Sequence, residues 1–111
     1  MDSLRLERCV ACHRGAPQVP DEDISQLHPS IPNWTLTRED DIRRLHREFK
    51  CLNFKGALDF SVQIGEMAEA EGHHPRITLE WGKVTVDWWT HKIRGLHRND
   101  FIMAAKTDQA F

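Results

Sequence analysis

The sequence predicts an α+β domain in which a four-stranded antiparallel sheet carries its helices on one face. Its hydrophobic patterns follow the order helix, strand, strand, helix, strand, strand, helix. Only a short turn separates the strands of each pair, which makes each pair an antiparallel hairpin. Two hairpins with helices before, between and after them pack most simply as one sheet covered on one side. The open edges of such a sheet offer a route to a dimer.

Length and composition limit the classes of protein that fit. The chain has 111 residues, of which 40% are hydrophobic and 29% are charged, so one globular domain with a real core is expected. A net charge of −2 and the lack of a long basic block argue against nucleic acid or anionic lipid as a partner. Short apolar runs predict no membrane span, and early charges predict no signal peptide, so we expect a cytoplasmic protein with reduced thiols.

Residues 1–33 form a proline-interrupted leader that we assign to the same domain as the core, residues 34–111. One short helix fits in this leader. Asp21 is its expected N-cap, and His28-Pro29 is its expected end because the residue before proline avoids the helical region.

The first hairpin is predicted from residue 34 onward. Residues 34–37 suit a short strand and the charged residues 38–41 suit a turn. Alternation then indicates a second, half-buried strand that contains Leu45, Arg47, Phe49 and Cys51.

A long central helix follows, with Asn53 as its N-cap. Gly72 is the expected left-handed residue at its end, and Pro75 prevents continuation. The residues that share one helical face, with Phe60 and Met67 beside them, are Phe54, Ala57, Leu58, Ser61, Ile64, Gly65 and Ala68.

The second hairpin spans residues 76–91 and turns at Gly82. In its second strand Val84, Val86 and Trp88 point to one face, and His91 points to the other, where it escapes the core and faces a cleft beside Trp89. A last helix, from about residue 98 to residue 109, is expected to bury Phe101, Ile102, Ala104 and Ala105.

Polar side chains gather where the central helix ends. Carboxylates in the last turns oppose the helix dipole, and such departures from local preference tend to mark sites. For Glu66 and Glu71 a solvated surface remains the favoured interpretation. The full set is Glu66, Glu69, Glu71, His73 and His74, followed by His91 and Asp100.

The spacing of these residues resembles the pterin-4a-carbinolamine dehydratase family. The matching pattern is Glu69, His73-His74-Pro75, Trp81, His91 and Asp100. The flanking segments look like the bacterial branch associated with phenylalanine hydroxylase, and the leader is similar to that branch too, so the resemblance covers nearly the whole chain.

This resemblance implies a lyase that removes water from a 4a-hydroxytetrahydropterin and gives the quinonoid dihydropterin, with neither cofactor nor metal. It implies a homodimer or homotetramer that works beside an aromatic amino-acid hydroxylase. It also implies an active site of His73, His74, His91 and Asp100, in a pterin pocket lined by the three histidines with Glu69, Pro75 and Thr90.

Imidazoles suit this reaction because loss of hydroxide from C4a needs an acid at the leaving oxygen and a base at N5. An unperturbed histidine has a pKa of about 6.5 and serves either role near neutral pH. We assign His73 and His91 as the acid–base pair, without deciding which donates, and His74 as the residue that orients the pterin.

Three supporting residues carry more specific expectations. Asp100 either benefits from the dipole of the last helix or accepts a hydrogen bond from an imidazole, which we expect to be His91. Glu69 could hold His73 or a polar edge of the pterin. Relatives often have Ser or Thr at position 97, whereas this chain offers His97 or Asn99 as the cap of the last helix.

Other interpretations remain open from the sequence. Cys9, Cys12 and His13 match the C-x-x-C-H pattern of haem attachment, which we reject because that chemistry follows export, and a single C-x-x-C is weak as a zinc site. The three histidines of the predicted site could instead bind a catalytic zinc, because three imidazoles suffice as its protein ligands. From a different class, the chain could serve as an oligomeric interaction module without essential catalysis.

Overall fold

The computed structural model describes residues 4–10 and 14–111, and it contains the predicted four-stranded antiparallel sheet. The strands lie in the order β1-β2-β4-β3, so β2 and β4 are central. The strands are β1 (Thr35–Glu39), β2 (Ile42–Lys50), β3 (Arg76–Glu80) and β4 (Lys83–Trp88). The α-helices described are α1 (Asp21–Leu27), α2 (Phe54–Glu71) and α3 (Arg98–Ala110), and the short 3₁₀ helices are η1 (Leu4–Leu6), η2 (His28–Ser30) and η3 (His91–Ile93).

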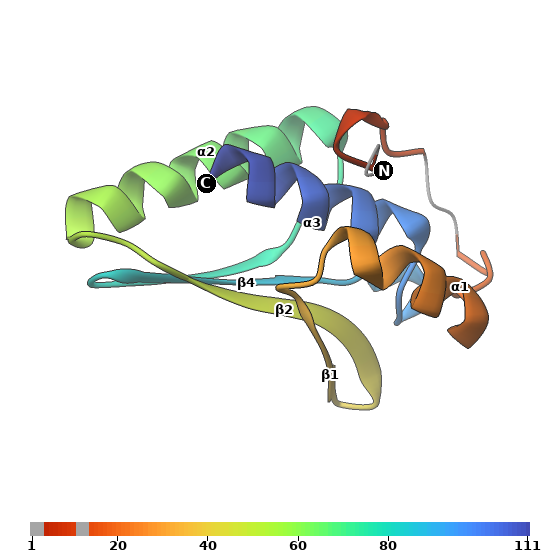
Figure 1. The fold of residues 1–111 in the computed structure, drawn as a ribbon. Helices are drawn as coiled ribbons and strands as arrows, with labels where there is room; N and C mark the ends of the chain where they lie inside the picture. Colours follow the sequence, from red (N-terminus) through yellow and green to blue (C-terminus); the bar gives the residue numbers. More distant parts are fainter. Residues whose placement is uncertain (1–3, 11–13) are drawn as a thin grey trace.

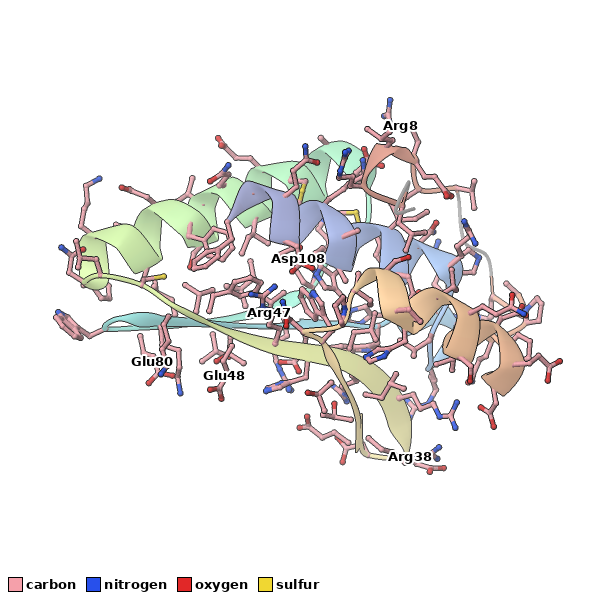
Figure 2. The ribbon with its side chains drawn as sticks, in the orientation of Figure 1. Arg8, Arg38, Arg47, Glu48, Glu80 and Asp108 are labelled. Atoms are coloured by element: carbon pink, nitrogen blue, oxygen red, sulfur yellow. The ribbon has the colours of Figure 1, made fainter. Side chains whose placement is uncertain are left out.

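Helices α2 and α3 lie over the same face of the sheet, as the sequence predicts (Figure 1). Between this face and α3, Arg47 donates to the Asp108 carboxylate at 2.6 Å, while Glu48 and Glu80 project from the opposite face (Figure 2). The largest fully buried side chains between the layers include Trp34, Trp88, Phe49 and Phe101. No helix within the described ranges is long and apolar enough to cross a membrane.

Both hairpins turn within the predicted segments, although Arg38 and Glu39 belong to β1 rather than to the first turn, and Cys51 lies just after β2 rather than in it. Asp40 and Asp41 take φ values of 54° and 61°, and Gly82 takes 75°, so each turn uses the left-handed region that tight hairpins require. The first strand begins later than predicted, at Thr35. Trp34 stays outside it because its ring is buried and its Nε1 donates to Asp108 at 2.8 Å.

Helix α2 begins and ends as predicted. The Asn53 side chain accepts from the Gly56 N–H at 2.8 Å, and Gly72 ends the helix with φ at 67°. The predicted face was partly wrong, because Phe54 and Leu58 are exposed. The residues that α2 buries follow a narrower stripe, Ala57, Phe60, Ile64 and Ala68.

Helix α1 starts differently from the prediction. Asp21 is its first helical residue rather than its N-cap, and Pro20 stands at the cap without a side-chain hydrogen bond. The Asp21 carboxylate instead accepts from Arg43 of β2. The predicted end is confirmed, since the α-helix stops at Leu27 and continues only as the 3₁₀ turn η2.

Helix α3 confirms its prediction, burying Phe101, Ile102, Ala104 and Ala105. The N-terminal residues run along it. Leu4 of η1 is buried in the core cluster, and Lys106 of α3 donates to the Arg5 carbonyl at 2.9 Å. Farther along, the Val19 N–H donates to the Leu96 carbonyl at 2.9 Å. The residues before β1 therefore pack against the segments that lead into and form the last helix.

Two glycines of the central helix give a matched test of its end. A Cβ at Gly72 or at Gly65 meets no heavy atom within 4 Å, so the two sites differ in backbone conformation rather than in space. We expect Gly72→Ala to destabilise the protein by about 1–2 kcal/mol, because left-handed backbone disfavours a Cβ. Gly65→Ala should stabilise it by up to about 1 kcal/mol, since position 65 is helical. Urea denaturation measures the free energy of unfolding of both variants. Equal changes in the two variants would contradict this role of the backbone conformation.

Candidate active site

The three predicted histidines line one cavity of about 700 Å³. It lies among the C-terminal end of α2, the segment after β4, the start of α3 and the N-terminal residues. Thr90 lines it as predicted, whereas Glu69, Pro75 and Asp100 are absent from its walls. The described lining residues are Cys9, Val10, Glu71, Gly72, His73, His74, Thr90, His91, Lys92 and Asn99.

The end of α2 turns His73 inward. After the left-handed Gly72, the His73 N–H donates to the Ala68 carbonyl at 3.2 Å, which holds the backbone against the last helical turn. The His73 ring stacks on Trp88 with their centroids 5.7 Å apart and their planes 6° from parallel. Only 8% of His73 is exposed, so this imidazole is fixed on one side by the core and meets the cavity on the other.

Behind His73 lies Asp100, which is fully buried. Its Oδ1 is 2.6 Å from His73 Nε2, and its Oδ2 accepts from the Thr90 hydroxyl at 2.7 Å and from the His97 N–H at 2.9 Å. An ionised carboxylate only accepts, so His73 Nε2 carries a proton and the other ring nitrogen, Nδ1, does not contact Asp100. The predicted partner of Asp100, His91, was wrong, because β4 has already ended before His91 and packing brings His73 to the carboxylate.

His91 reaches the cavity by a different route from the one predicted. Strand β4 ends at Trp88, and His91 begins the 3₁₀ turn η3 rather than extending the strand. A bridge between Thr90 and Gly95 closes this turn, whose end requires the left-handed Arg94. The predicted neighbour is confirmed, since the His91 and Trp89 ring centroids are 4.6 Å apart.

His74 lies on the exposed side of the cavity. Its Nε2 is 3.2 Å from Glu69 Oε2, and both side chains are mostly exposed. Of the two roles predicted for Glu69, contact with His73 was therefore wrong, because Glu69 reaches His74 instead. Contact of Glu69 with a polar edge of the pterin stays a prediction. Pro75 follows His74 and leads into β3 without lining the cavity.

Sequence reasoning missed the role of Glu71 as a structural anchor. Its Oε1 accepts from the Cys9 N–H at 2.9 Å and its Oε2 lies 3.1 Å from Arg8 Nε, so the solvated interpretation was wrong for this residue. The hydrogen bond from Cys9 holds the Glu71 pKa below its usual value, with help from the Arg8 charge and against partial burial. Glu66, by contrast, is exposed. No local pattern signals that position 71 meets position 9.

The cysteine motif does not supply a reactive thiol at Cys9. Burial, followed by the charges of Glu71 and Asp100, raises the Cys9 pKa to about 12, so the thiol stays protonated. Cys12 and His13, the other members of the motif, lie outside the described residues. Among the residues that the structure describes, no group of three or more His, Cys, Asp and Glu side chains is arranged to hold a metal ion.

The cap of α3 is His97, one of the two predicted candidates. Its Nδ1 accepts from the Asn99 N–H at 3.0 Å, while Asp100 accepts from the His97 N–H, which makes a reciprocal capping box. Because a backbone N–H can only donate, Nδ1 is unprotonated and His97 is neutral. Burial lowers the His97 pKa from its usual 6.5; the Asp100 charge opposes that shift and His73 adds to it.

Comparison with known proteins agrees with this geometry. Residues 17–110 match the model of the family described as Pterin 4 alpha carbinolamine dehydratase. A Nitrosococcus oceani protein named for pterin-4-alpha-carbinolamine dehydratase is 55% identical over 109 residues, covering 98% of this chain and 96% of that protein. A Gloeobacter violaceus protein named for the same activity is 53% identical over 106 residues, covering 96% and 91%.

The fold also has a solved counterpart. The crystal structure of a transcriptional coactivator/pterin dehydratase from Brucella melitensis superposes with a TM-score of 0.75, covering 85% of this chain and 98% of that one. At 24% sequence identity, this likeness shows the fold alone.

The neutral His97 cap predicts a loss of stability in mild acid. A histidine whose pKa is lower in the folded than in the unfolded state contributes fully to the free energy of unfolding above the unfolded-state pKa of about 6.5. That contribution is lost as the pH falls toward the folded-state pKa. His97→Asn keeps a cap acceptor that does not titrate. We expect the variant to lose less free energy of unfolding than the parent between pH 7 and pH 5 in urea titrations. Parallel curves for the two proteins would contradict this assignment.

Proposed function

The chain belongs to the pterin-4a-carbinolamine dehydratase family, and we propose that it performs this dehydration by acid–base catalysis with His73 and His91. The activity is that of a lyase, which removes water from a 4a-hydroxytetrahydropterin to give the quinonoid dihydropterin. The observation that carries the catalytic proposal is the convergence of three imidazoles on one cavity, one of them backed by a buried carboxylate.

In this proposal His73 is the base. With Nε2–H held by Asp100, a neutral His73 has its lone pair on Nδ1, and the adjacent carboxylate stabilises the imidazolium that forms on protonation. Nδ1 takes the proton from N5 of the substrate. The electron pair released at N5 forms the double bond to C4a, and the C4a–O bond breaks with its electrons on oxygen.

His91 is then the acid. It lies on the segment after β4, whereas His73 follows α2, and His91 is exposed to solvent beside Trp89. It protonates the departing oxygen, so that water leaves, and exchange with solvent restores both imidazoles. His74, also exposed and paired with Glu69, orients the pterin ring at the cavity mouth.

Two further aspects of the function belong to the same proposal. An aromatic amino-acid hydroxylase in the cytoplasm supplies the substrate, because such enzymes leave their pterin hydroxylated at C4a. The active form is a homodimer or homotetramer. Exposed apolar side chains on α2, namely Phe54, Leu58 and Val62, support self-association, as do the free sheet edges β1 and β3.

The activity is tested on its own substrate. Freshly made 4a-hydroxytetrahydropterin, generated by an aromatic amino-acid hydroxylase, should decay to the quinonoid dihydropterin faster with this protein than without it. An unchanged decay rate would contradict the proposed function. Protein freed of metal by a chelator should keep its rate, whereas loss of the rate, restored by zinc, would favour metal catalysis over the imidazoles.

Replacement of the imidazoles tests their roles. We expect His73→Gln and His91→Ala each to lower kcat by about 10²- to 10⁴-fold, the usual contribution of one acid or base. The double variant should approach the uncatalysed rate. His46→Gln is a matched control, since His46 pairs with the buried Asp87 at 2.7 Å but lies outside the cavity.

Stability measurements accompany these rates, because His73 is buried against Trp88 and its loss can loosen the fold. Full activity in a folded double variant would refute the catalytic assignment. It would also favour the alternative that the chain is chiefly an interaction module.

A further inference from the structure

The N-terminal arm, residues 4–10, forms a wall of the active-site cavity. Cys9 and Val10 line that cavity together with the histidines. The family model matches only residues 17–110, so this wall lies outside the part of the chain that the family model covers. The family model therefore does not account for the arm, although the Nitrosococcus relative matches 98% of this chain and so extends into it.

The Asn99 side chain holds the arm through the backbone of Val10. The Asn99 Oδ1 accepts from the Val10 N–H at 3.1 Å, and the Asn99 Nδ2 donates to the Val10 carbonyl at 2.8 Å. Asn99 is only 2% exposed, and both ends of its amide are used in this contact. The pair of bonds holds the peptide of residue 10 while leaving its side chain free to meet a ligand.

A second anchor comes from α2. Glu71 accepts from the Cys9 N–H and pairs with Arg8, while Glu7 pairs with Arg98 of α3 at 2.7 Å. These anchors belong to the same two helices that deliver His73 and Asp100. The arm is thus held in a fixed position relative to the proposed base.

The arm supplies the apolar side chains of the cavity. All other described lining residues carry polar or charged side chains except Gly72, which has none. Val10 is 62% exposed although its backbone is fixed, so it presents an ordered apolar surface that a ligand can cover. The Cys9 thiol stays protonated and adds a small, weakly polar surface beside it.

We propose that the N-terminal arm determines substrate specificity, with Val10 and Cys9 contacting the C6–C7 edge of the pterin and its C6 substituent. This inference rests on the proposed function. The pyrimidine ring of a pterin carries its hydrogen-bonding groups, which suit the polar walls, whereas C6 and C7 form its carbon edge. Because Asn99 has already ordered the arm, substrate binding gains this contact without ordering a loop.

The test compares Val10→Ser with Leu52→Ser, the same kind of change at an 89% exposed leucine outside the cavity. The substrates are the 4a-hydroxy forms of 6-methyltetrahydropterin and of 6-(1,2-dihydroxypropyl)tetrahydropterin. We expect Val10→Ser to raise KM for the 6-methyl substrate by about three- to tenfold, the loss expected for one apolar contact, with kcat within twofold. KM for the substrate with the polar dihydroxypropyl substituent should rise less, and Leu52→Ser should change neither KM nor kcat.

A change in kcat alone, or equal effects of the two serine variants on KM, would overturn the proposal. Binding of 6-methyl-7,8-dihydropterin, followed by tryptophan fluorescence, separates it from the proposed function. If the parent protein shows no turnover but Val10→Ser weakens this binding, the dehydratase activity fails and the arm's role stands. If turnover is normal and neither binding nor KM responds to Val10→Ser, the arm's role fails alone.

Discussion

The buried carboxylate of Asp100 is the constraint on which the site depends. A carboxylate removed from water costs several kcal/mol unless donors replace its hydration. Here the donors are His73, Thr90 and the His97 backbone, from the end of α2, the exit of β4 and the cap of α3. Satisfying this one charge fixes the relative positions of three segments, and these segments form the walls of the cavity. The requirements of folding and the geometry of the site are therefore met by the same contacts.

The second His–Asp pair shows why geometry, rather than the pair itself, carries the function. His46 and Asp87 lie 2.7 Å apart on the open face of the sheet, where Arg76 also contacts the carboxylate. The His46 imidazole lies outside the cavity that the three other histidines line. The Asp87 carboxylate is also paired with the Arg76 guanidinium. His73 combines a buried carboxylate partner with an aromatic support, and it lines the cavity.

Most signals that act over a few residues were predictable from the sequence, although the N-cap of α1 was not. Asn53 caps α2 and Gly72 ends it because each requirement is met within one helical turn. The convergence of His73, His74 and His91 on one cavity was expected as well. Contacts across the fold were not predictable: Asp100 lies nine residues after His91 yet contacts His73, and Glu71 meets Cys9 from 62 residues away. Such partners depend on how helices pack over the sheet, which hydrophobic spacing does not specify.

The tautomer of His73 is the most direct measure of the central claim that Asp100 prepares this imidazole as a base. Long-range ¹H–¹⁵N correlation spectra of the labelled protein at neutral pH distinguish protonated from bare ring nitrogens. We expect a proton on His73 Nε2 and a bare Nδ1, and we expect this preference to disappear in Asp100→Asn. A bare Nε2 in the parent protein, or the same tautomer in both proteins, would contradict this claim.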